Sequence, residues 1–179
     1  YHLARLLQAG GQTDEAEVLW REQRTLLDDE VRQQPNPAAH QDLSYVLGQL
    51  GDLDRERGSR WRFAPWPPAP SPLHVGVILH DLALLSIGPT YLRHAADAYR
   101  QGMREQRLLL KIGPPQSMHY MMLNRHALPL TIVAEQLGSY EDMTDAAEGA
   151  AKAAQGLASE PDGGQRYRMA AGYMANCVA

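Results

Sequence analysis

The stretch Gly11-Gln12-Thr13-Asp14-Glu15-Ala16-Glu17-Val18-Leu19-Trp20 predicts a tight turn followed by the first turns of an amphipathic helix. Thr13 suits the N-cap position, and the two acidic residues after it lie where the helix dipole favours negative charge. Ala16 and Trp20 are four residues apart, so they share one face of the helix. That face combines a small residue, where another helix can approach, with a ring that fills the space beside it.

The same pattern returns in residues 90–99, with Ala95 and Tyr99, and more loosely in residues 138–147. A unit that recurs in this way is typical of a helical repeat array, in which each unit buries its apolar face against its neighbours. No run of residues alternates with the period of two that marks a half-buried strand. The sequence therefore predicts an all-α fold.

Apolar residues recur at helical spacing in eight segments, which turn residues separate. Asn36 and Ser139 are expected caps at helix starts, and Gly58 and Gly138 are expected helix ends. The expected helices cover residues 1–9, 13–34, 37–58, 72–87, 90–112, 116–137, 140–160 and 165–178.

Prolines interrupt this order at three places. Gly88-Pro89 is expected to end one helix, and Pro129 is expected either to kink its helix or to split it. Residues 59–71 hold four prolines and three large aromatic residues, so we expect an irregular insertion that replaces a helix. Its aromatic side chains are expected to cover the apolar edge that the missing helix would have covered. The apolar segment 72–87 is expected to be the most buried helix.

Composition narrows the class of protein. The 179 residues have a net charge of −4, which gives neither a basic footprint for nucleic acid nor a polybasic patch for a membrane. No apolar run reaches the roughly 20 residues that cross a bilayer. Cys177 is the only cysteine, which favours a reducing compartment and a cytoplasmic location. The chain begins at Tyr1 inside a helical pattern, so we expect it to be a fragment of a longer protein.

The repeated unit resembles the tetratricopeptide repeat family across nearly the whole chain. Ala16 and Trp20 match the packing positions of the second helix of a repeat, and Leu3-Ala4 match the paired positions of the first helix. Equivalent first-helix positions fall at Leu47-Gly48, Leu82-Ala83 and Leu130-Thr131. The resemblance implies one domain over residues 1–179, built as a right-handed α-solenoid of about four helix hairpins, one of them degenerate.

A narrower resemblance concerns the two ends of the chain. Residues 9–22 are similar to a repeat unit in the tails of planctomycete-type bacterial serine/threonine kinases, and residues 167–179 are similar to the closing segment of those tails. No glycine-rich phosphate loop, HRD loop or DFG motif occurs in this sequence. The resemblance therefore implies a scaffold piece of a kinase-type protein, without kinase activity of its own.

Members of the repeat family bind a peptide or a partner helix in the concave groove lined by their first helices. The resemblance implies such a non-catalytic role here, with a protein partner and with no cofactor, metal, nucleic acid, membrane or small-molecule substrate. The side chains that it places in the groove are Arg5, Gln8, Tyr45, Gln49, Asp52, His80, Arg125 and Glu135.

Two other functions stay open at this point. An HD-type metal-dependent phosphohydrolase would hold its metal with His40, His80-Asp81 and a late aspartate, Asp142 or Asp145. This hypothesis requires that these side chains converge in the fold. A structural spacer without a partner of its own is the other alternative.

Two further clusters have ordinary structural interpretations. His119 and His126 are seven residues apart and could share a helix face. Two histidines without thiolates or carboxylates nearby are weak support for zinc, and solvated histidines or histidines at the edge of the core are favoured. Met118, Met121 and Met122 would suit an adaptable binding surface, although filling of the core is the favoured interpretation.

Overall fold

The computed structural model describes residues 1–62, 75–114 and 116–159, and all regular structure within these ranges is helical. The all-α prediction is therefore confirmed for the described chain. The helices are α1 (His2–Ala9), α2 (Thr13–Gln33), α3 (Pro37–Arg62), α4 (Val75–Ile112), α5 (Ser117–Leu137) and α6 (Tyr140–Ala158).

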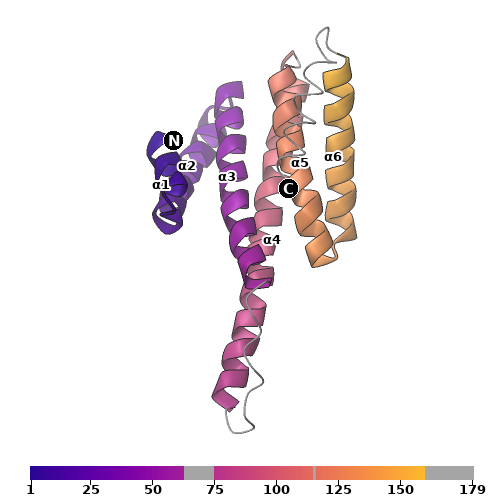
Figure 1. Cartoon of the computed structure of the whole chain (residues 1–179). Coiled ribbons are helices and arrows are strands. Elements are labelled where there is room, and N and C mark those ends of the chain that lie inside the picture. Colours follow the sequence, from indigo (N-terminus) through magenta and orange to yellow (C-terminus); the bar gives the residue numbers. More distant parts are fainter. Residues whose placement is uncertain (63–74, 115, 160–179) are drawn as a thin grey trace.

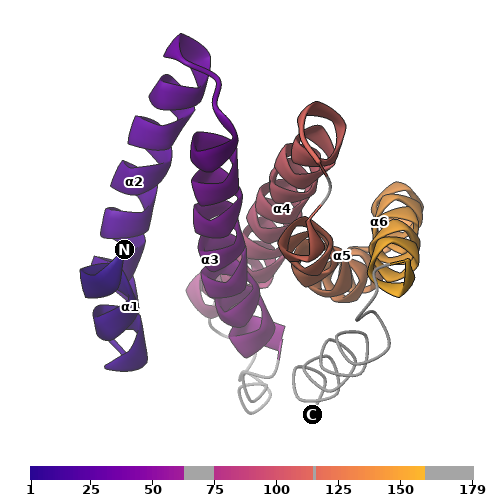
Figure 2. The same ribbon diagram turned by 90° about the horizontal axis from the view of Figure 1, so that it is seen from above.

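Each helix packs against the next one in the chain, and α3 also contacts α5 while α4 contacts α6. Figures 1 and 2 show α1 and α2 at one end of the molecule and α6 at the other. The described helices thus form three successive pairs, α1 with α2, α3 with α4, and α5 with α6.

Several helix boundaries follow the local signals in the sequence. The Asn36 side-chain oxygen accepts a hydrogen bond from the Ala39 N–H at 2.8 Å, and the Ser139 hydroxyl accepts one from the Asp142 N–H at 3.4 Å. Gly138 ends α5 with a φ of 67°, a conformation that glycine adopts without steric cost. The Thr13 cap is wrong, because Thr13 is already the first helical residue of α2.

Two expected helix ends are also wrong. Helix α3 continues through Gly58 to Arg62, and α4 runs without a break through Gly88-Pro89. A Cβ atom on Gly58 would lie 2.7 Å from the Leu92 side chain and 3.1 Å from the Gly88 carbonyl oxygen. Gly58 is therefore a point of close approach between α3 and α4, and packing over their length outweighs the local stop signals.

These two corrections change the order of the helix pairs. Residues 72–87 and 90–112 were expected to pair as two helices, but residues 75–112 belong to one helix, so Leu82-Ala83 do not lie in a separate first helix. The end of α4 that was expected to be most buried extends past the other described helices (Figure 1). Residues 59–62 of the expected insertion are helical. Residues 63–71, the last expected helix and Cys177 lie outside the described residues, as does the Trp61 side chain.

The described core has two apolar clusters. Ala16 and Trp20, both 0% exposed, belong to the first cluster, and Ala95 and Tyr99 occupy the corresponding positions in the second. The packing role predicted for these residues is confirmed. The first cluster joins α1, α2 and α3 through Ala4, Ala16, Trp20, Leu27, Leu43, Val46, Leu47, Leu50 and Leu53. The second joins α4, α5 and α6 through Leu92, Ala95, Ala96, Tyr99, Met103, Leu123, Ala127, Leu130, Val133, Ala146 and Ala153.

His126 of α5 lies between these clusters, in space that two glycines leave open. A Cβ atom would lie 3.0 Å from its Cε1 atom if placed on Gly48 of α3, and 2.6 Å if placed on Gly102 of α4. Gly48 thus leaves room for a side chain of α5. The Ser44 hydroxyl lies 2.8 Å from His126 Nε2 and donates to the Gly102 carbonyl at 3.3 Å. The imidazole of this α5 residue thus contacts both α3 and α4.

Complete burial, together with a smaller effect of the neighbouring Arg125 charge, lowers the pKa of His126 to about 3. The ring is therefore neutral at physiological pH. Since the Ser44 hydroxyl donates its proton to Gly102, the hydrogen-bond network assigns the imidazole proton to Nε2, which donates to Ser44. Nδ1 is then an unpaired acceptor, which is a smaller cost than an unpaired donor.

Replacement of Gly102 by alanine tests this packing. Alanine favours a helix by about 1 kcal/mol over glycine, but overpacking a filled site costs about 1–3 kcal/mol. Because a Cβ atom on Gly102 would lie 2.6–2.8 Å from three ring atoms of His126, we expect the upper end of that cost. Gly102→Ala should then lower the free energy of unfolding by about 2 kcal/mol in urea denaturation followed by circular dichroism. Gly113→Ala, directly after the end of α4, is the control for a site with free space, because the nearest atom to its Cβ would be 4.0 Å away. A Gly102→Ala protein as stable as the parent would contradict the packing.

Acidification tests the neutral state of His126. An unfolded chain binds a proton on this residue near pH 6.5, whereas the folded chain does so only near pH 3. Between these values the unfolded state binds more protons, so stability falls as pH falls, by about 1.4 kcal/mol per pH unit. We expect this contribution to the pH dependence of the free energy of unfolding to be absent in His126→Gln and present in His2→Gln. In NMR spectra of the parent protein, a His126 ring that titrates near pH 6.5 would overturn the assignment.

Candidate partner-binding surface

Tyr45 lies at the centre of an aromatic cluster that joins α1, α2 and α3. Its ring centroid is 6.0 Å from those of Trp20 and Tyr1, in edge-on geometry in both cases. Trp20 is buried, and its Nε1–H donates to the Gln8 side-chain oxygen at 3.3 Å. Burial, together with the neighbouring Asp42 carboxylate, raises the pKa of Tyr1 to about 12. The predicted surface residues Tyr45 and Gln8 thus both contact Trp20 or its cluster.

Arg125 connects this cluster to α5. Its guanidinium carbon lies 5.3 Å from the Tyr45 ring centroid, and its Nη2 lies 3.5 Å from an Asp52 carboxylate oxygen. Asp52 also accepts a hydrogen bond from the Tyr99 hydroxyl at 2.7 Å, so α3, α4 and α5 meet at one carboxylate. Burial raises the pKa of Tyr99 well above its ordinary value, and the charge of Asp52 raises it further.

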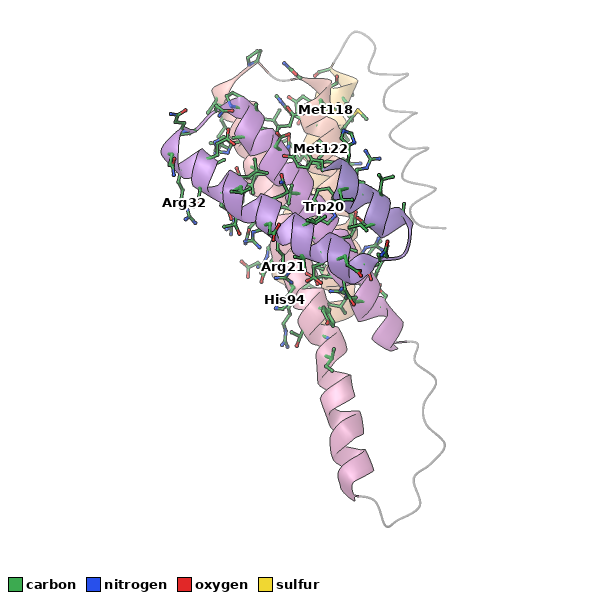
Figure 3. All side chains as sticks on the ribbon, turned by 90° about the vertical axis from the view of Figure 1, so that its left-hand side faces the viewer. Trp20, Arg21, Arg32, His94, Met118 and Met122 are labelled. Atoms are coloured by element: carbon green, nitrogen blue, oxygen red, sulfur yellow. The ribbon has the colours of Figure 1, made fainter. Side chains whose placement is uncertain are left out.

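Arg125 is also the middle member of a row of side chains on α5. Met118, Met121, Leu128 and Ile132 recur with it at intervals of three and four residues, so all five share one face, named here the α5 strip. Met118 is 48% exposed and Met121 is 41% exposed, while Leu128 and Ile132 are half-buried. The interpretation of Met118 and Met121 as core filling is therefore wrong. Figure 3 shows Met118 and Met122 near the upper end of the molecule.

The structure brings together three of the eight predicted groove residues, Tyr45, Asp52 and Arg125. Gln49 lies between Tyr45 and Asp52 in the sequence and is buried. Arg5 of α1 is exposed, as is Glu135 near the end of α5.

His80 does not belong with this group. It lies 19 residues before Tyr99 on the same continuous helix, which at the α-helical rise is about 28 Å along the axis. Tyr99 contacts Asp52, so the backbone of residue 80 is far from the Tyr45–Asp52–Arg125 group. The groove position expected for His80 assumed a separate first helix over residues 72–87, whereas residues 75–112 form one helix.

The geometry also separates the residues of the HD hypothesis. His40 Nδ1 lies 2.6 Å from a Glu105 carboxylate oxygen, and Glu105 is 25 residues from His80 on α4, about 37 Å along the helix axis. Asp142 lies 3.2 Å from Arg100, and Asp145 lies 2.6 Å from Arg107. The described residues contain no group of three or more potential ligands placed to hold a metal ion.

His119 and His126 are both buried on the core side of α5. His126 is 0% exposed, so the expectation of a solvated or core-edge histidine is wrong for this residue. His126 is held by Ser44, and burial lowers the pKa of His119. Both histidines therefore have a structural role in the packing of α5.

The α5 strip was not predicted, although the sequence contains a signal for it. Helix α5 has one buried apolar face, which includes Leu123, Leu130 and Val133. The intervals between Met118, Met121, Leu128 and Ile132 give it a second one, so the helix is apolar on two sides. A helix that is apolar nearly all round is normally buried, and the exposed methionines show that this one is not fully covered.

No family model, curated protein or solved structure matches this chain. None of the described helices is both long enough and apolar enough to cross a membrane.

A double-mutant cycle tests the contact between Tyr45 and Arg125. We expect Tyr45→Leu and Arg125→Met to show a coupling of about 0.5–1 kcal/mol in urea denaturation, the range for a partly exposed cation–π pair. The pair Tyr45 and Arg5 is the matched control and should show additive effects. Additive effects for Tyr45 and Arg125 would contradict the contact.

Proposed function

We propose that this chain is a non-catalytic protein-interaction scaffold that binds a helix or peptide of a partner protein on the surface formed by the α5 strip and Tyr45. The observation that supports this proposal is the exposure of Met118 and Met121 on a helix whose other apolar face already lies in the core. Apolar side chains in a row on a surface are typical of a site that a partner covers.

The chemistry of the surface suits an extended helical partner. The strip runs over 15 residues, about 21 Å, which is about four turns of a partner helix. Methionine side chains are unbranched and polarisable, so they adapt to partners of different shape. The Tyr45 ring adds a rigid surface that loses little conformational entropy when it is covered.

The tetratricopeptide-type solenoid and the place in a kinase-type protein are part of the same proposal. Support comes from three successive helix pairs and from the matching burial of Ala16 with Trp20 and of Ala95 with Tyr99. Of the alternatives, the HD phosphohydrolase gains no support, because His40 and His80 are far apart. A spacer without a partner remains the competing function.

Selection of helical peptides from a display library separates the scaffold from the spacer. We expect selected peptides to bind the parent protein saturably and to lose at least about tenfold in affinity for Met118→Asp/Met121→Asp, measured by fluorescence anisotropy. The control is Val18→Asp/Leu26→Asp, which places the same charges at exposed apolar positions of α2. Circular dichroism checks that both variants fold.

Two results would count against the scaffold. One is a selection that yields no saturable binder, as a spacer predicts. The other is a set of binders that the α2 variant weakens as much as the α5 variant does, because their site would then not be the α5 strip.

A further inference from the structure

We propose that the partner segment is an amphipathic helix that places a single carboxylate, flanked by apolar side chains, against Arg125. This inference rests on the proposed function and adds the chemistry of the partner. It concerns one charged position within an otherwise apolar contact.

Arg125 occupies the middle position of the α5 strip. It lies seven residues from Met118 and seven from Ile132, so two apolar positions of the strip stand on each side of it. A helix that packs along a row with intervals of three and four presents its own side chains at the same intervals. One side chain of the partner therefore meets Arg125, and those before and after it meet apolar groups.

Arg125 has more hydrogen-bond donors than its ion pair with Asp52 uses. A guanidinium has five N–H donors, and the only ion-pair partner of Arg125 among the described residues is Asp52, reached through Nη2 at 3.5 Å. The Tyr45 ring lies against the guanidinium at 5.3 Å and holds its position. The side chain is 26% exposed, so donors remain accessible from the surface.

The local charge balance decides the sign of the partner group. Asp52 is shared by Arg125, by the Tyr99 hydroxyl and by Arg55, whose Nη2 lies 3.9 Å away. At Asp52, two guanidinium groups thus share one carboxylate. Glu56 acts on Arg55 but is not an ion-pair partner of Arg125 among the described residues. Asp42, three residues before Tyr45, is hydrogen-bonded to Tyr1. A carboxylate complements this arrangement and an ammonium group does not.

Apolar neighbours limit the number of charges. A carboxylate that pairs with Arg125 becomes partly desolvated beside the methionines, where a charge-assisted hydrogen bond is stronger than in water. A second or third carboxylate on the partner would lie against Met121 or Leu128 without a cation, which is unfavourable. The surface therefore suits a mostly apolar stripe with one acid, not an acidic tail.

Three synthetic 21-residue helical peptides test the inference. All carry leucines at intervals that match the strip, and they differ only in a central Glu, Gln or Lys. We expect the Glu peptide to bind the parent protein about tenfold more tightly than the Gln peptide in fluorescence anisotropy, with the Lys peptide weakest. In Arg125→Met the preference for Glu over Gln should vanish while binding of the Gln peptide is kept. Arg5→Met is the matched control and should keep the preference.

The outcomes separate this inference from the proposed function. If all three peptides bind the parent protein equally well, the binding surface stands and the role of Arg125 is overturned. The role is also overturned if Arg125→Met keeps the preference for Glu. If none of the peptides binds, the proposed surface fails together with the inference.

Discussion

The arrangement of the central helices depends on the space that Gly48 and Gly102 leave for the His126 ring. The two apolar clusters lie on opposite sides of this point, one built from α1 to α3 and the other from α4 to α6. Since apolar packing is not directional, neither cluster fixes how one half sits against the other. The contact between the buried His126 imidazole and the Ser44 hydroxyl does fix how the two halves sit together. A shift of one turn along α3 would leave both polar groups unpaired.

The same contact orients the surface. Arg125 precedes His126 directly, and adjacent helical residues point about 100° apart around the axis. Because His126 points into the junction with α3 and α4, Arg125 emerges at its edge, where it meets Tyr45 and Asp52. The residues at intervals of three and four from Arg125 then form the exposed row on α5. A register set in the core thus determines which side chains α5 presents on its outer face.

Much of the fold follows from local patterns in the sequence. The packing positions at Ala16, Trp20, Ala95 and Tyr99 were predictable because one helix face carries the whole signal. The errors have the opposite cause. Gly58 was expected to end a helix. It instead leaves space for the Leu92 side chain across the α3–α4 interface, and the local sequence does not show that contact. The site was predictable only in part for the same reason: Tyr45 and Arg125 are 80 residues apart, and no local pattern brings them together.

Helix α5 also bears on the choice between a scaffold and a spacer. A spacer needs only the buried face, formed around Leu123, Leu130 and Val133, and its outer face can be polar throughout. Helix α5 instead carries exposed Met118 and Met121, which add aggregation risk and no core packing. It also carries one arginine in the middle of that row, tied to an aromatic ring and a carboxylate of α3. A mostly apolar surface with one oriented charge has the composition that the proposed scaffold function requires, since apolar contact would supply affinity and the charge would supply discrimination between partners.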